Sequence, residues 1–110
     1  MVETDPMPYE LRTYTTIPGR MDALLARFRD HTVALFEKHG MHSVGYWLSD
    51  ADPNVLIYLL NHDGDPKQNW VAFQSDADWI AAKAASVIDG EIVDHLESLF
   101  LSPTDFSALA

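Results

Sequence analysis

Three side chains that could act on a ligand alternate along a short segment near the start of the chain. Glu10, Arg12 and Tyr14 lie two residues apart within residues 9–15, which are rich in the aromatic and β-branched residues typical of a strand. Alternate side chains of a strand share one face, so we expect the three groups to point the same way. Arg12 could hold a carboxylate or an enolate, and Tyr14 could donate a hydrogen bond to a developing oxyanion. The competing interpretation is a structural ion pair of Arg12 with Glu10 or with an acid of a partner chain.

A second pair of candidates belongs to the most apolar segment of the chain, residues 54–60, and to the residues directly after it. Tyr58 and His62 share one face of the predicted strand, with His62 at its mouth. A neutral imidazole there could remove a proton from an acidic carbon, whereas the competing interpretation is a solvated turn residue. The candidate catalytic residues are therefore Arg12, which would orient a substrate, Tyr14 or Tyr58, which would stabilise charge, and His62, which would act as the base.

The remaining histidines do not predict a metal site. His39 and His42 are three residues apart, but Gly40 separates them across a predicted helix end, and no third ligand is identifiable nearby. Helix capping explains His39 without a metal. His31 could reach a pocket edge or a haem iron, but a tolerated position beside an apolar stripe is the simpler account, and His95 lies among acids on a predicted edge strand. We therefore expect neither a metal nor a cofactor.

The three tryptophans and the missing motifs narrow the chemistry further. Trp47, Trp70 and Trp79 could form an aromatic box for a planar ligand, although tryptophans at helical or strand spacing are more often core and interface anchors. The sequence has no Gly-rich phosphate loop, no Gly-x-Ser-x-Gly elbow and no His-Glu-x-x-His motif. Nucleotide binding and serine hydrolysis are therefore not expected.

Composition limits the partners and the compartment. Seventeen acidic and seven basic residues give a net charge of −10, which repels nucleic acid and anionic membrane surfaces, so neither is an expected partner. The absence of cysteine excludes disulfides and is compatible with a reducing cytosol. Residues 1–8 lack the features of a signal peptide and hold little to bury. We expect a flexible N-terminal arm there and one domain over residues 9–110, in a soluble cytoplasmic protein.

The elements that must position the candidate residues follow from the hydrophobic pattern. It predicts strand, helix, strand, strand, helix and strand, over residues 9–15, 21–39, 42–49, 54–60, 66–90 and 91–101. Gly40 and Gly90 are expected to end the two helical regions. The second region has two predicted starts, with Asp65 and Ser75 as N-caps.

The order β-α-β-β-α-β predicts an α+β, ferredoxin-like fold, with a four-stranded antiparallel sheet and both helices on one face. Residues 54–60 are apolar at alternate and intervening positions, so both faces of that strand must be dry. We expect Val55, Ile57 and Leu59 to pack against the helices. The other face, with Tyr14 and Tyr58, would be covered by a second copy of the chain, because each large apolar side chain removed from water stabilises association by roughly 1.5 to 3 kcal/mol.

Short motifs along the chain, taken together, resemble the NIPSNAP family. They are YELRTY at residues 9–14, PG at 18–19, KHG at 38–40, VGYW at 44–47, Trp70, DADW at 76–79 and LSPTDFS at 101–107. The resemblance implies a dimeric α+β barrel over residues 9–107, the architecture that the family shares with small cofactor-free monooxygenases, some haem-degrading enzymes and lactone isomerases. No catalytic activity is firmly attached to the family, so the resemblance implies fold and assembly rather than a mechanism.

Two classes of function stay open at this point. One is a small-molecule site in a homodimer, between sheet and helices or between the two sheets, with a monooxygenase or isomerase of activated carbon acids as its catalytic form. The other is a non-catalytic dimer that binds a ligand or another protein. The sequence therefore predicts a small homodimeric protein of unestablished activity with a small-molecule pocket, and it leaves open whether the protein is an enzyme.

Overall fold

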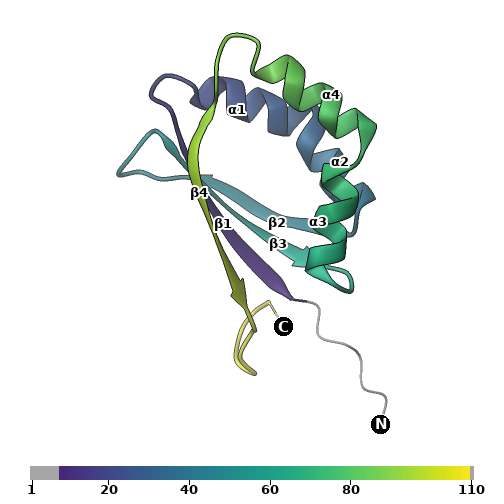
Figure 1. Ribbon diagram of the computed structural model, residues 1–110. Coiled ribbons are helices and arrows are strands. Elements are labelled where there is room, and N and C mark those ends of the chain that lie inside the picture. The colour runs from purple at the N-terminus through teal and green to yellow at the C-terminus, as the bar shows by residue number, and fades with distance from the viewer. Residues whose placement is uncertain (1–7, 110) are drawn as a thin grey trace.

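A computed structural model of the chain describes residues 8–109, so most of the predicted N-terminal arm, residues 1–7, lies outside the described residues. The described chain forms one four-stranded antiparallel sheet with its helices stacked on one side (Figure 1). The elements are β1 (Tyr9–Thr16), α1 (Met21–Arg27), a π-helical turn (Phe28–Thr32), α2 (Val33–Lys38), β2 (Met41–Leu48), β3 (Val55–His62), α3 (Pro66–Gln74), α4 (Ala77–Ser86) and β4 (Val93–Leu101). The strand order β2-β3-β1-β4 confirms the predicted ferredoxin-like fold.

The first helical region differs from its predicted form in one respect. A single apolar stripe predicts one continuous helix, but a π-helical turn at Phe28–Thr32 separates α1 from α2. Thr32 contributes to this turn because its hydroxyl donates to the carbonyl oxygen of Arg27 at 3.2 Å, five residues back. The region ends as predicted at Gly40, whose φ of 77° only glycine adopts readily.

The second helical region has two caps, and one of them was predicted wrongly. Asp65 caps α3 as predicted, since its side chain accepts from the backbone N–H of Lys67 at 3.0 Å. Asp76, rather than Ser75, caps α4 by accepting from the backbone N–H of Asp78 at 2.8 Å. Asp76 also binds Lys38 at the end of α2 at 2.8 Å, so a contact between distant elements favours the aspartate over the serine.

Strand β3 has two apolar faces, and the structure reverses their predicted assignment. Leu56, Tyr58 and Leu60 are buried under the helices, with exposed fractions of 2% or less. Residues 55, 57 and 59, which we expected to pack against the helices, instead lie on the opposite face of the sheet and are only partly buried. Both sets are apolar, so the local pattern could not distinguish them.

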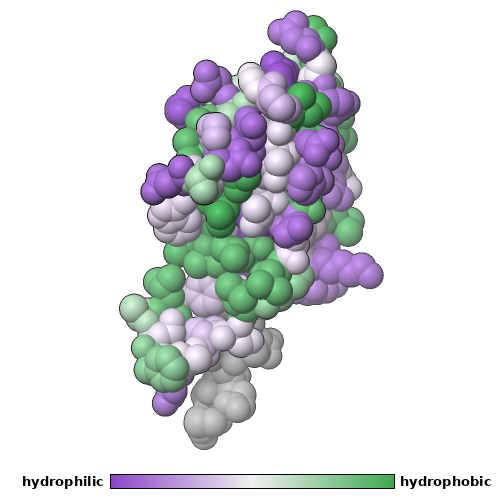
Figure 2. Space-filling view, turned by 90° about the vertical axis from the view of Figure 1, so that its left-hand side faces the viewer, coloured by the Kyte–Doolittle hydropathy of each residue, from purple (hydrophilic) through white to green (hydrophobic). Residues whose placement is uncertain are grey.

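The two faces of the whole sheet therefore have different surroundings. The helix-covered face holds an aromatic core in which the Tyr58 ring lies 5.3 Å from Phe28 and 5.9 Å from Phe36. The other face, called the bare face below, carries exposed apolar side chains, including Trp47 at 54% and Leu99 at 58%. Figure 2 shows apolar surface spreading across this side of the molecule.

The bare face consists of side chains that share register across all four strands. They are Trp47 of β2, Val55, Ile57 and Leu59 of β3, Tyr9, Leu11, Thr13 and Thr15 of β1, and His95, Glu97, Leu99 and Leu101 of β4. The Trp47 ring lies against Gly45, and a Cβ atom there would overlap the indole in its present position. The C-terminal residues 102–109 border one end of this face, where a small groove lies between them, Tyr9 and Leu59.

Candidate functional site

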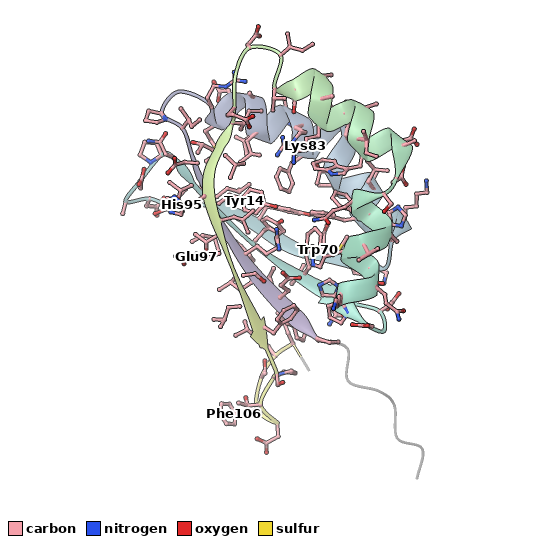
Figure 3. All side chains as sticks on the ribbon, in the orientation of Figure 1. Tyr14, Trp70, Lys83, His95, Glu97 and Phe106 are labelled. Carbon is pink, nitrogen blue, oxygen red and sulfur yellow. The ribbon has the colours of Figure 1, made fainter. Side chains whose placement is uncertain are left out.

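A cavity of about 600 Å³ lies between the sheet and the helices α3 and α4. Its aromatic wall consists of Trp70, Phe73 and Trp79, and aliphatic side chains of α4 and β4 complete the apolar lining. Figure 3 shows Tyr14 of β1, Trp70 of α3 and Lys83 of α4 pointing into this cavity, whereas His95 and Glu97 point outward from β4. The predicted candidates of β1 therefore face the helices and not a space between two sheets.

A buried carboxylate organises the polar groups beneath the cavity. Glu10 is 1% exposed, and four side chains from four elements donate hydrogen bonds to it. The donors are His62 Nε2 at 2.7 Å, Trp70 Nε1 at 2.8 Å, Arg12 Nη1 at 2.9 Å and the Ser98 hydroxyl. Such a group is stable in a protein interior only when its hydrogen-bonding capacity is satisfied, and here it is.

The hydrogen bonds determine the charge of this carboxyl group. Burial by itself would raise the pKa of Glu10, but the hydrogen bonds from His62, Ser98, Trp70 and Arg12 outweigh it and lower the pKa from 4.5 to about 2. Glu10 is therefore ionised at neutral pH and compensates the charge of Arg12. The sequence left open whether Arg12 forms an ion pair with Glu10 or belongs to a functional cluster with Glu10 and Tyr14. In the structure Arg12 does both, because it pairs with Glu10 and also bonds to Tyr14.

Arg12 connects the carboxylate to two phenols. Its Nε donates to the Tyr58 hydroxyl at 2.8 Å, and its Nη2 donates to the Tyr14 hydroxyl at 3.1 Å. The guanidinium carbon lies 4.1 Å from the centre of the Trp70 ring, which adds a cation–π contact. All three nitrogens of Arg12 therefore have partners within the protein, so this residue fixes the positions of other groups.

The hydroxyl protons of the two tyrosines can be assigned from their partners. The Tyr58 hydroxyl accepts from Arg12 and donates to the Tyr14 hydroxyl at 3.0 Å. Burial raises the pKa of Tyr58 well above 10, so this phenol keeps its proton. The Tyr14 hydroxyl accepts two hydrogen bonds, and its own proton remains free for an acceptor. Because Tyr14 lines the cavity, that acceptor can be an oxygen of a ligand.

His62 occupies a different position from the one its predicted role requires. It is fully buried, and the side-chain amide of Asn69 donates to its Nδ1 at 3.2 Å. With Nδ1 accepting from Asn69, the imidazole Nε2–H donates to Glu10. His62 does not line the cavity, so the role of base stays a prediction that would require proton transfer by way of Glu10.

Arg27 is a cavity residue that the sequence analysis did not select. It is 7% exposed, its Nη1 donates to the Ser86 hydroxyl at 3.2 Å, and its guanidinium carbon lies 5.2 Å from the centre of the Trp79 ring. Its Nε is buried without a hydrogen-bond partner. One signal for it exists in the sequence, since a charged residue three positions after Leu24 falls within an apolar stripe.

The other residues considered from the sequence lie outside the cavity or beside it. Within residues 8–109, no group of three or more histidine and acidic side chains is arranged to hold a metal. His39 contacts Asp76 at 2.7 Å, and His42 lies between Glu37 and Asp63 at 2.8 and 2.7 Å. His31 and His95 are exposed. Of the three tryptophans, Trp70 and Trp79 line the cavity and Trp47 lies on the bare face.

Comparison with known proteins supplies the family. The family model for NIPSNAP matches residues 9–108, which is nearly the whole chain. The chain belongs to the NIPSNAP family. This assignment confirms the resemblance that the short motifs indicated.

Solved structures agree with the NIPSNAP assignment at the level of the fold. A NIPSNAP family protein of unknown function from Agrobacterium tumefaciens strain C58 is 24% identical, with 96% of this chain and 95% of that chain covered and a TM-score of 0.80. A second NIPSNAP family protein from that strain is also 24% identical, with 94% and 98% covered and a TM-score of 0.81. A Bordetella bronchiseptica protein, named as a candidate antibiotic biosynthesis monooxygenase, is 15% identical, with 91% and 99% covered and a TM-score of 0.69.

Two negative results complete the comparison. No curated protein matches the NIPSNAP chain. In the part of the chain that the structure describes, no helix has the length and apolar character needed to cross a bilayer.

Proposed function

We propose that this NIPSNAP protein binds a small molecule in the cavity between its sheet and helices α3 and α4. The observation that carries the proposal is the combination of an aromatic wall with a preorganised polar floor around about 600 Å³ of space. Ligand sites typically have volumes of roughly 300 to 1,000 Å³ and a few convergent polar groups in an apolar lining. Here Tyr14 supplies a free hydroxyl proton, and Arg12 and Tyr58 hold that hydroxyl in place.

The same proposal includes a homodimer formed through the bare face. Exposed apolar side chains from β2 and β4, together with the partly buried ones of β1 and β3, lie on this one face. Large patches of this kind mark interaction surfaces, and a second copy offers an equally apolar face. The cavity lies on the opposite side of the sheet, so ligand binding and dimerisation use separate surfaces.

A cavity-filling variant tests ligand binding directly. Ala81 and Ala84 are both exposed on α4, but only Ala84 lines the cavity. We expect the flat, neutral probe 2-naphthamide to bind the wild-type protein and Ala81→Trp in isothermal titration, and to lose binding to Ala84→Trp. Equal binding to both variants would contradict the proposal, because the probe would then bind elsewhere.

A catalytic form of this function, a cofactor-free monooxygenase or isomerase of activated carbon acids, is favoured by one specific observation. The free Tyr14 proton, backed by the charge of Arg12, is the arrangement that stabilises an enolate oxygen. Arg12 and Tyr58 would position Tyr14, and His62 would hold the Glu10 carboxylate on which Arg12 depends. The monooxygenase candidate among the structural neighbours shares the fold and supports considering this chemistry.

Deuterium exchange measures the proton-transfer step that both catalytic alternatives require, in which the C–H bond breaks, the proton goes to solvent, the electron pair forms the enolate, and Tyr14 donates to the enolate oxygen. We expect the protein to accelerate exchange at C1 of 2-tetralone in D₂O, followed by NMR, and oxygen consumption to accompany it only if the protein is an oxygenase. Tyr14→Phe should abolish the acceleration. The matched control is Tyr46→Phe, because the Tyr46 hydroxyl bonds to Ser43 at 2.7 Å and not to the cavity groups. Exchange no faster than in buffer would exclude this chemistry for 2-tetralone and leave the binding function alone.

A further inference from the structure

The charges around the cavity differ from those of the rest of the molecule. The chain has seven Lys and Arg residues and 17 Asp and Glu residues. Three of those cations line the cavity, Arg12, Arg27 and Lys83, and only one of the acids does, Glu91. A strongly acidic protein therefore gathers positive charge at its one large aromatic-walled cavity among the described residues.

These three cations are not equally available to a ligand. Arg12 is compensated by Glu10 at 2.9 Å, and each of its three nitrogens already donates to a protein oxygen. Lys83 extends from α4 toward the enclosed space (Figure 3), on an exposed residue whose ammonium group water can solvate. Arg27 is the exception, since it is more than nine-tenths buried and forms no ion pair with any residue in the range 8–109.

The Arg27 guanidinium lacks a hydrogen-bond acceptor at one of its nitrogens. Its Nε is buried with no hydrogen-bond partner, whereas its Nη1 is held by Ser86 and its guanidinium lies against Trp79. Burial lowers the pKa of Arg27, with opposing contributions from Tyr14, Tyr58 and Glu91. A buried guanidinium without a carboxylate partner is costly, and because Arg27 lines the cavity, an anion bound there would offset that cost.

The shape of the site suggests the rest of the ligand. Trp70, Phe73 and Trp79 present ring faces and edges that favour a flat, conjugated molecule. Tyr14 lines the same cavity and has a hydroxyl proton to donate. The π-helical turn that begins directly after Arg27 breaks the regular helix at this point, as such turns frequently do at functional sites.

We infer that the ligand of this cavity is a flat aromatic or conjugated carboxylate, or the enolate equivalent, whose negative oxygen accepts from the Arg27 guanidinium while a further ligand oxygen accepts from Tyr14. This inference deepens the proposed function and rests on it. Arg27 is thus a specificity-determining residue, because it makes the cavity select anions over neutral molecules of the same shape.

A pair of probes that differ only in charge tests the inference. Isothermal titration compares 2-naphthoate with neutral 2-naphthamide, each against wild-type protein, Arg27→Gln and Arg29→Gln. Arg29 is the matched control, since it lies two residues away, is exposed and loses the same charge. We expect 2-naphthoate to bind wild type and Arg29→Gln roughly tenfold or more tightly than Arg27→Gln, the effect of one charge-assisted hydrogen bond. Naphthamide should bind all three proteins alike.

The outcomes separate the inference from the proposed function. If naphthamide binds wild-type protein as tightly as naphthoate, the anion preference is wrong and the ligand cavity stands. If neither probe binds at millimolar concentration, the proposed binding of flat molecules fails together with the inference. The probe comparison on wild-type protein needs no variant, so it decides even if Arg27→Gln does not fold. Indole NMR signals of Trp70 and Trp79, but not of Trp47, should shift on binding, and a shift confined to Trp47 would contradict the inference.

Discussion

The two faces of the sheet differ in how their apolar side chains are shielded from water. The helix-covered face embeds a charged cluster in an aromatic core, with Glu10 and His62 both 1% exposed or less. The bare face is apolar over most of its area and has Trp47 and Leu99 more than half exposed. A buried charged group is stable where hydrogen-bond partners surround it, whereas a large exposed apolar surface marks an interaction site. We propose that the first face binds a ligand and that the second binds another copy of the chain.

The largest expected effect comes from a charge placed on the bare face of β4, compared with a charge placed on the other face of the same strand. Leu99→Glu places a carboxylate on the bare face, and we expect it to raise the dimer dissociation constant by roughly a thousandfold, because two copies each lose the burial of one large apolar side chain. Sedimentation velocity over a range of micromolar concentrations measures the effect. The matched control is Leu96→Glu, also exposed and on β4 but facing the cavity side, which should stay dimeric. Wild-type protein that sediments as a monomer would refute the dimer.

The next effect concerns the charged cluster under the helices. Glu10→Gln removes the carboxylate on which Arg12 and His62 depend, and breaking a buried pair in this way costs roughly 3 to 5 kcal/mol of the free energy of unfolding. Urea unfolding at neutral pH and one fixed protein concentration measures it. Asp89→Asn, at an exposed position in the turn after α4, should change stability by less than about 0.5 kcal/mol. Similar effects at the two positions would mean that the buried cluster around Glu10 does not stabilise the fold as described.

The pH dependence of stability tests the ionisation of Glu10. Its pKa is about 2 in the folded protein against 4.5 for an unperturbed glutamate, so the unfolded chain binds the proton first as the pH falls. Its stabilising contribution is complete above pH 4.5 and is lost as the pH falls toward 2, by roughly 2 kcal/mol at pH 3. Urea unfolding of wild type and Glu10→Gln between pH 5.5 and 3 isolates this term. Identical slopes for the two proteins would show that Glu10 is not ionised as proposed.

The smallest effect comes from one donor to the same carboxylate. Ser98→Ala deletes the hydroxyl of β4 that donates to Glu10, and we expect a loss of about 1 kcal/mol in unfolding free energy. Acid unfolding should also begin at a higher pH, because fewer hydrogen bonds hold the pKa of Glu10 low. Ser102→Ala, exposed just beyond the strand, is the control. An unchanged acid transition in Ser98→Ala would argue against a shared network.

The sequence predicted which site residues share a face within each strand, but not how β1 and β3 bring the two sets together. The alternation of Glu10, Arg12 and Tyr14 correctly placed them on one face, and Tyr58 with His62 on one face of β3. Joining the two sets required the register in which Arg12 lies opposite Tyr58 and Glu10 opposite Leu60. Arg27 was missed because a single arginine in an apolar stripe is not distinguishable from a helix-surface residue until α4 packs against it.

The sequence by itself determined the elements, their order, the glycine stop at Gly40 and the cap at Asp65, because these depend on contacts between residues close in the chain. Only the tertiary structure decided which face of β3 the helices cover. A strand that is apolar on both sides has no local preference between them, and the choice depends on pairing and packing between elements far apart in sequence. The same long-range packing closed the cavity, placed Asp76 rather than Ser75 at the start of α4, and left Arg27 Nε buried beside Trp79 without a partner.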